Sequence, residues 1–238
     1  MIELVQTGQI SEERIDLSIR RILRDMFRLG AFDNPYLDED HAEQIVGNKR
    51  SYALGERTQR RAMVLLKNAD TAGKSILPLQ GRPKLYIEGI SANVVSQDAD
   101  VVSTPEQADL ALLRLSTPYE PRNGNFLEQL FHAGDLDFKS PEKERLLDIL
   151  AHVPTIVVIH LDRPAVIPEI AASCVALLGE FGASDRAVLD VVFGYTAPEG
   201  KLPFEMPSSM DAARKQRSDV PSDSEQPLFR YGHGLRYT

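Results

Sequence analysis

Apolar residues in the first part of the chain recur at helical spacing. Over residues 11–29, isoleucine, leucine, methionine and phenylalanine return every three or four positions, while arginine and aspartate fill the opposite face. Ser11 stands at the expected N-cap and Gly30 follows the last turn. A second helix is expected over 49–62. The pattern therefore predicts a helical arm at the start of the chain.

After residue 62 the apolar residues form short continuous runs instead. Runs of strand length occur at 63–66, 84–90, 110–115, 155–161 and 174–179. The segments expected to be helical in this part are 141–152, 164–172 and 184–193. Continuous apolar runs indicate strands buried on both faces, and strands that alternate with helices form a mostly parallel sheet. We predict an α/β fold, a three-layer sandwich with a mostly parallel central sheet, preceded by a helical connector arm.

Charge and composition exclude several classes of partner. The 35 acidic and 27 basic side chains leave a net charge of −8, which repels the phosphates of nucleic acid. No apolar run approaches the roughly 18 to 20 residues of a spanning helix, and residues 1–10 lack the features of a signal peptide. For the chain as it stands we expect no nucleic-acid or membrane partner and a cytoplasmic location. The single cysteine, Cys174, lies among apolar residues and is expected to be a buried structural thiol.

The chain lacks the sequence motifs of several common kinds of site. Neither a Walker loop nor a Gly-x-Gly-x-x-Gly turn follows a predicted strand, and no Gly-x-Ser-x-Gly elbow occurs. The five histidines are scattered, and none has the spacing of a zinc site. We expect no cofactor and no metal ion.

Carboxylates gather in the segment 116–140, which fits neither the helical nor the strand period. The segment follows a predicted strand, and loops beyond the carboxyl ends of parallel strands often carry the chemistry of such folds. Its acidic residues are Glu120, Glu128, Asp135 and Asp137. From the residues alone, each of them fits either an acid/base group or a solvated loop charge.

Three segments together resemble one known family. Residues 14–36 resemble the connector that leaves the catalytic barrel in glycoside hydrolase family 3, the β-glucosidase type. Residues 192–204 resemble that family's Leu-Phe-Gly and Pro-x-Gly-Lys-Leu-Pro signature, and residues 229–237 resemble its terminal Tyr-Gly-His-Gly-Leu-x-Tyr. Leu65-Leu66-Lys67-Asn68, with Leu77-Pro78-Leu79, is similar to the start of the family's second domain. The similarity spans nearly the whole chain in the family's order.

The resemblance implies that the catalytic residues are shared between two domains. In the family, a barrel domain binds glucose and carries the aspartate nucleophile, while an α/β sandwich closes over the cleft and often supplies the acid/base glutamate. By this resemblance residues 1–48 are a connector from a missing barrel domain, and residues 49–238 are the C-terminal sandwich domain. A retaining glycosidase needs two carboxyl groups roughly 5 to 5.5 Å apart. The chain alone is therefore expected to be inactive.

The implied partners are a β-linked oligosaccharide or glucoside and the barrel domain, and self-association through the exposed barrel-facing surface is also expected. A non-catalytic carbohydrate-binding or protein-interaction module remains the alternative function. For the acid/base group the resemblance favours Glu120, with Glu128 and Asp135 as reserves. Some family members have Gly-Glu-x-Pro-Tyr-x-Glu here, and Pro118-Tyr119 aligns with its central pair. Ser116 occupies the place of the first glutamate, and Glu120 comes one residue before the second, where Pro121 stands.

Overall fold

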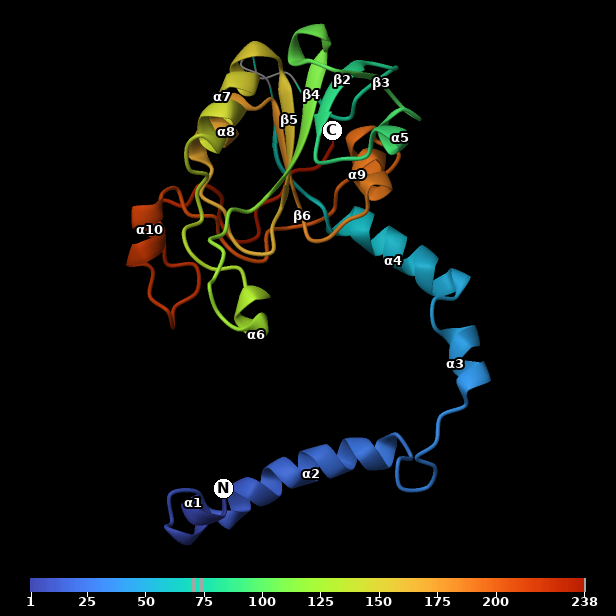
Figure 1. Cartoon of the computed structure of the whole chain (residues 1–238), viewed down its shortest axis with the longest axis vertical. Coiled ribbons are helices and arrows are strands. Elements are labelled where there is room, and N and C mark those ends of the chain that lie inside the picture. The colour runs from blue at the N-terminus through green and yellow to red at the C-terminus, as the bar shows by residue number, and fades with distance from the viewer. Residues whose placement is uncertain (70–71, 73–74, 238) are drawn as a thin grey trace. The chain divides into compact units, whose positions relative to one another are not determined.

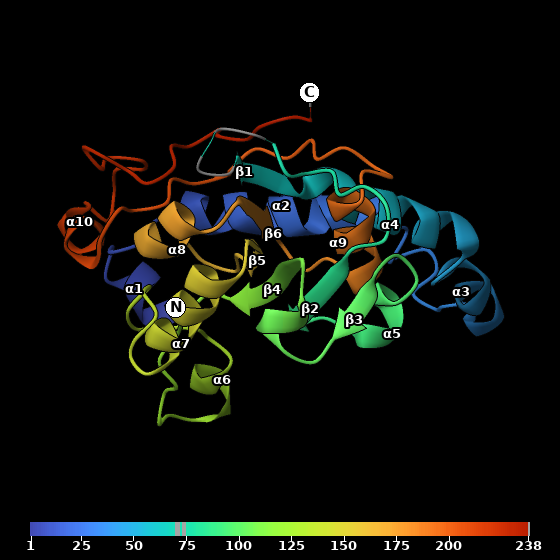
Figure 2. The ribbon, with the colours of Figure 1, turned by 90° about the horizontal axis from the view of Figure 1, so that it is seen from above.

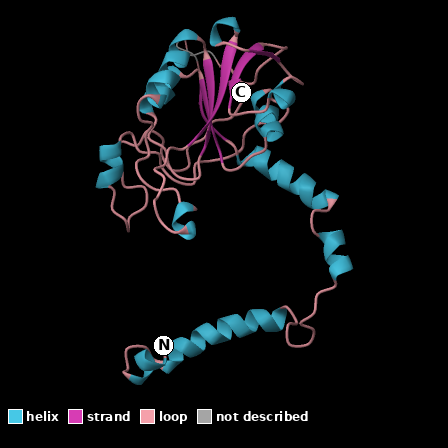
Figure 3. Ribbon diagram, in the orientation of Figure 1, coloured by secondary structure: helices cyan, strands magenta, loops and turns pink. Residues whose placement is uncertain are grey.

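The computed structural model describes residues 1–69, 72 and 75–237 and divides into two compact units. The first unit, Met1–Tyr52, consists mainly of helices. Figures 1 and 3 show these helices, which are α1 (Ile2–Gln6), α2 (Glu12–Arg28) and α3 (Glu39–Ile45). The hydroxyl of Ser11 caps α2 by accepting the amide of Arg14 at 3.2 Å, as expected. All residues of these three helices are exposed or half-buried. Helix α4 (Lys49–Ala62) then leads into the second unit, Ala53–Thr238.

A six-stranded sheet forms the centre of the second unit. The strands are β1 (Val64–Asn68), β2 (Lys84–Glu88), β3 (Asp100–Val102), β4 (Leu110–Ser116), β5 (Thr155–His160) and β6 (Ala176–Glu180). Their order is β1-β6-β5-β4-β2-β3, and only β1 runs antiparallel to its neighbour. The predicted mostly parallel sheet is confirmed.

Helices cover both faces of this sheet (Figures 1 and 2). Successive residues of each central strand point to opposite faces, so Leu112 and Leu113 belong to two different hydrophobic clusters. One cluster contains residues of α5 (Ala92–Val95) and α9 (Asp185–Val192), and the other contains residues of α7 (Glu142–His152) and α8 (Pro168–Ser173). Because both faces are covered, β5 is buried along nearly its whole length. This is the predicted three-layer arrangement.

A few elements differ from the sequence prediction. The helix expected over 164–172 begins only at Pro168, because Val166 pairs with Asp137 in an isolated bridge and proline favours a first helical position. The edge strand β3, the one-turn helix η1 (Pro105–Gln107) and the short helices α1, α3 and α5 were not predicted, nor were α6 (Phe126–Gln129) and α10 (Met210–Lys215). Such short elements carry too few residues for a clear period.

The environment of the cysteine and the character of the helices also bear on the sequence predictions. Cys174 is 1% exposed, and burial raises the pKa of its thiol to about 11, as expected of a structural cysteine. Among the described residues, no helix combines the length and the apolar character that crossing a bilayer requires.

Candidate active site

The carboxyl ends of three neighbouring strands bring polar residues into one row. Strands β4, β5 and β6 end at Ser116, His160 and Glu180, and the register pairs Ser116 with His160 and His160 with Glu180. Thr117 then donates its amide and its hydroxyl to the carbonyl of His160, at 3.1 and 2.8 Å. The long loop 117–141, between β4 and α7, therefore starts from a fixed point at this carboxyl edge.

Glu180 is the fully buried carboxylate of the carboxyl edge. Its Oε1 lies 3.0 Å from Arg114, and its Oε2 accepts the amides of Gly182 and Ala183 at 2.6 and 2.7 Å. Burial by itself raises the pKa of Glu180, but the hydrogen bonds from Ala183 and Arg114 outweigh it and hold the pKa below its usual range. Glu180 is therefore a permanent charge that anchors the turn after β6.

Glu120 lies on the same edge with very different neighbours. Its amide donates to the carbonyl of Ala133 at 2.9 Å, and this bridge joins the two limbs of the loop. Gly134 lies against the side chain, since a Cβ at that glycine would come within 2.5 Å of the carboxyl carbon of Glu120. Among the described residues, none forms an ion pair with Glu120, and the residue is exposed. The backbone of Glu120 is therefore fixed by the bridge, and its side chain lies against Gly134.

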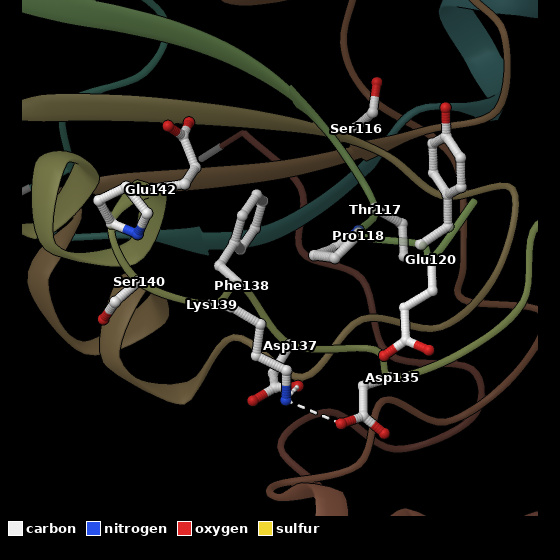
Figure 4. Close-up of a pocket in the computed structure, with 12 residues that line it drawn as sticks. Ser116, Thr117, Pro118, Glu120, Asp135, Asp137, Phe138, Lys139, Ser140 and Glu142 are labelled. Atoms are coloured by element: carbon white, nitrogen blue, oxygen red, sulfur yellow. Dashed lines mark hydrogen bonds and ion pairs between the residues drawn. The ribbon is translucent and has the colours of Figure 1, made fainter.

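A pocket of about 380 Å³ opens beside Glu120, within the size range of small-molecule sites. Figure 4 shows the carboxyl groups of Glu120 and Asp135 on the same side of this pocket, with Lys139 beside Asp135. The lining is residues 116–120, Asp135 and residues 137–142. Both limbs of the loop and the start of α7 therefore contribute to one carboxylate-rich hollow.

The two reserve candidates have different surroundings. Asp135 forms ion pairs with Lys139 and with Arg214 of α10, at 2.8 and 2.9 Å. The hydrogen bond from Lys139, followed by that from Arg214, lowers the pKa of Asp135, so this carboxyl group stays ionised. Glu128, in α6, instead folds back on Asn125, whose Nδ2 lies 3.3 Å from its Oε1. The structure thus brings Glu120 and Asp135 into one pocket and leaves Glu128 outside its lining.

Sequence reasoning missed the residues that surround Glu120. The ring of His132 stacks on the ring of Tyr119, with centroids 3.8 Å apart and planes 6° apart, and its Nδ1 contacts the carboxylate of Asp162. Arg163 donates to the carbonyl of Gly134 at 2.6 Å. Asp162 and Arg163 lie in the β5–α8 loop, about thirty residues further along the chain than the groups they hold. No spacing rule connects such distant residues, so no sequence signal identified them.

Among the carboxylates that line the pocket, Glu120 alone has no ion-pair partner within the described residues. Within residues 1–69, 72 and 75–237, no three His, Cys, Asp or Glu side chains gather in a way that could hold a metal ion. Proton transfer to or from a bound molecule needs a group within hydrogen-bond reach of the pocket, and Glu120 lines it.

Comparison with known proteins identifies the family. A model of the glycosyl hydrolase family 3 C-terminal domain matches residues 85–237. Beta-glucosidase C of Emericella nidulans is 50% identical over 238 residues, which are 100% of this chain and 38% of that relative. The periplasmic beta-glucosidase/beta-xylosidase of Dickeya chrysanthemi is 39% identical over 239 residues, 99% of this chain and 36% of that relative. The chain thus spans less than two fifths of the length of these curated relatives.

Solved structures share the fold. A beta-glucosidase from Listeria innocua in complex with glucose superimposes with a TM-score of 0.71 at 19% identity, over 99% of this chain and 40% of that one. A β-glucosidase from Erythrobacter marinus superimposes with a TM-score of 0.72 at 22% identity, over 99% and 42%. The family model covers the pocket loop and both carboxyl-terminal signature segments, and the chain therefore belongs to the glycosyl hydrolase family 3 C-terminal domains.

Proposed function

We propose that this chain is the C-terminal domain of a β-glucosidase-type, retaining glycoside hydrolase, and that Glu120 is its acid/base residue. One observation carries the proposal: Glu120 is a carboxyl group without an ion-pair partner among the described residues, and it is held at the wall of a pocket at the carboxyl edge of a parallel sheet. The names of the relatives support the glycosidase class and a β-glucoside as substrate.

The chemistry divides between two carboxyl groups. In the first step Glu120 donates its proton to the glycosidic oxygen, while a nucleophilic carboxylate attacks the anomeric carbon from the other side. In the second step Glu120 accepts a proton from the water that releases the sugar. The other three carboxylates of the pocket lining are paired with cations: Asp135 with Lys139 and Arg214, Asp137 with Lys139, and Glu142 with Arg145. In this proposal the nucleophile therefore belongs to a separate barrel domain.

The exposed apolar face of α2 supports the second half of the proposal, a docking role for residues 1–48. Large apolar side chains on this helix remain solvent-exposed, among them Ile22 at 62% and Phe27 at 66%. We propose that residues 1–48 connect the barrel to the sandwich domain of residues 49–238, and that these side chains pack on the barrel. The chain alone then lacks glycosidase activity, and its uncovered apolar residues promote self-association.

The alternative is a non-catalytic carbohydrate-binding or protein-interaction module. The observation in its favour lies at the tip of the loop 117–141. Four apolar residues there are between 61 and 74% exposed to solvent, namely Phe126, Leu127, Leu130 and Phe131. Apolar side chains gathered on an exposed loop are typical of a contact surface. Titration of the 238-residue chain with laminaribiose and cellobiose by calorimetry separates the two functions. Tight binding of a disaccharide by the chain alone favours the module.

The decisive experiment replaces Glu120 in a complete enzyme that contains both domains. Glu120→Gln removes the acid, so hydrolysis of glucosides with poor leaving groups should slow by roughly 10²- to 10⁴-fold. Activated aryl glucosides need no protonation in the first step and should form the glycosyl-enzyme normally, and azide should restore its breakdown.

The matched control is Glu128→Gln, a change of the same chemistry in the same loop but outside the pocket lining. Under this proposal it should leave both classes of substrate unaffected. Small and equal effects of Glu120→Gln on both classes, with a loss confined to poor leaving groups in Glu128→Gln, would assign Glu120 to the solvated loop charges and the acid/base role to Glu128.

A further inference from the structure

The loop 117–141 has a first limb that contains Glu120 and a second limb that contains Ala133 and Gly134. Residues of a separate segment contact the second limb. Glu120 is on the first limb, and its amide bonds to Ala133 on the second. The second limb is held from outside the loop by two consecutive residues, Asp162 and Arg163. Residues of the β5–α8 loop therefore contact the limb to which Glu120 is hydrogen-bonded.

Two series of contacts, or routes, connect Asp162 and Arg163 with Glu120. By the first, Asp162 contacts Nδ1 of His132, and the His132 ring stacks on Tyr119, the residue immediately before Glu120. By the second, Arg163 donates to the carbonyl of Gly134, the residue against which the side chain of Glu120 lies. The first route reaches the residue before Glu120, and the second reaches the glycine beside its side chain.

The partners of the first route are more enclosed than a surface pair. The side chains of His132 and Asp162 are 37 and 29% exposed. A second histidine–aspartate pair, His152 with Asp148 on α7, is 61 and 75% exposed and has a separation of 3.5 Å. Surface pairs of this second kind contribute little, whereas the first pair closes a contact between two separate loops.

We propose that Asp162, acting through His132, and Arg163 are positioning residues that hold the carboxyl group of Glu120 in the pocket. The inference rests on the proposed acid/base function of Glu120. A proton donor must stay within hydrogen-bond reach of the glycosidic oxygen, and a displacement of about 1 Å can cost 10²-fold in rate. The loop 117–141 is largely irregular apart from the single turn of α6, so contacts from a second loop are needed to restrict it.

The test is Asp162→Ala in a complete enzyme with both domains, assayed on glucosides with poor and with activated leaving groups. A displaced acid should slow the poor leaving groups by roughly 10- to 100-fold and the activated ones much less. The ratio of the two rates does not depend on how much of the variant is folded, so a loss of stability alone cannot produce this result. The control is Asp148→Ala, which breaks the surface pair and should leave the ratio unchanged.

Two further variants identify the route. His132→Phe keeps an aromatic ring beside Tyr119 but loses the nitrogen that contacts Asp162, so it should reproduce the effect of Asp162→Ala. The double variant Glu120→Gln/Asp162→Ala should be no slower on poor leaving groups than Glu120→Gln alone, because both changes remove one function.

An equal loss on both classes of substrate, or additive losses in the double variant, would overturn the positioning role. If Glu120→Gln slows poor leaving groups while Asp162→Ala does not, this inference fails and the proposed function stands. If Glu120→Gln itself has no effect that depends on the leaving group, the proposed function fails first.

Discussion

Glu120 and Glu180 stand at the same edge of one sheet in opposite surroundings. Glu180 is buried and bound by Arg114 and two backbone amides, which keep it ionised. Glu120 is exposed at a pocket wall, where its backbone amide is hydrogen-bonded and its carboxyl group has no ion-pair partner among the described residues. Position at the carboxyl edge therefore does not by itself give a glutamate a function. The charges and amides around it decide whether it stabilises the fold or faces a ligand.

The largest expected effect is on stability at Glu180. Glu180→Gln removes the charge that pairs with half-buried Arg114, and breaking a buried ion pair on one side should lower the free energy of unfolding by about 3 kcal/mol. Urea unfolding of the 238-residue chain measures this loss. Glu120→Gln, the same change at the exposed site, should alter the free energy of unfolding by less than about 0.5 kcal/mol. Similar losses of unfolding free energy in the two variants would show that the two glutamates contribute equally to stability.

The contribution of Glu180 should also depend on pH with a definite sign. Its pKa is lower in the folded chain than its ordinary value, so its stabilisation is present above the unfolded pKa of about 4.3. The stabilisation is lost as the pH falls through the folded pKa. The gap in unfolding free energy between wild type and Glu180→Gln should therefore shrink between pH 6 and pH 3 in urea titrations. A gap that widens on acidification would mean that burial, which raises the pKa, outweighs the hydrogen bonds.

A smaller effect on stability is expected where Gly134 supports Glu120. Gly134→Ala places a Cβ within 2.5 Å of the Glu120 carboxyl carbon at a φ of +79°, so the glutamate must move. Stability should fall by about 1 kcal/mol, while in a complete enzyme turnover of poor leaving groups should fall roughly tenfold more than that of activated ones. The control is Gly81→Ala, at a φ of +71° with no atom within 4 Å of the added Cβ. If both variants change the leaving-group ratio equally, the contact with Glu120 is not the cause.

The smallest expected effect is on the pKa of Asp135. This carboxylate lines the pocket, as Glu120 does, but is paired with cationic side chains, as Glu180 is. Lys139→Met removes the main cause of its lowered pKa, so the pKa of Asp135 should rise toward its ordinary value while Arg214 still holds it below that value. Carbon-detected NMR titration of the carboxyl groups measures this change. Lys143→Met is the control, because Lys143 pairs with Glu169 instead. An unchanged pKa in Lys139→Met would show that Arg214 alone keeps Asp135 ionised.

The fold was largely predictable because its central strands are buried on both faces. The run at 155–161 is apolar except at Thr155 and His160, and β5 occupies Thr155–His160 with almost complete burial. The short edge strand β3 was missed because its three residues are exposed or half-buried and carry no strong pattern. The helix expected over 164–172 was extended too far toward its start, where Val166 forms a bridge with the pocket loop.

Much less of the candidate site could be predicted. The loop 116–140 and its carboxylates were evident from the pattern, and Glu120 was chosen by resemblance to the family's motif; its role remains a prediction. Glu180 was absent from the candidates because it directly follows an apolar run, and nothing local distinguishes a paired buried carboxylate from a solvated one. Asp162 and Arg163 were missed because their partners lie about thirty residues away.

The longer helices, the central strands, their mostly parallel sheet and the family could be inferred from the sequence, because apolar periodicity and short motifs are properties of neighbouring residues. Which carboxylates are held ionised, which one lies at the pocket without an ion-pair partner among the described residues, and which distant residues contact its loop became visible only in the folded chain. The reason is physical: a carboxyl group's charge depends on burial and on hydrogen-bond donors a few ångströms away, and those donors come from segments that only folding brings together.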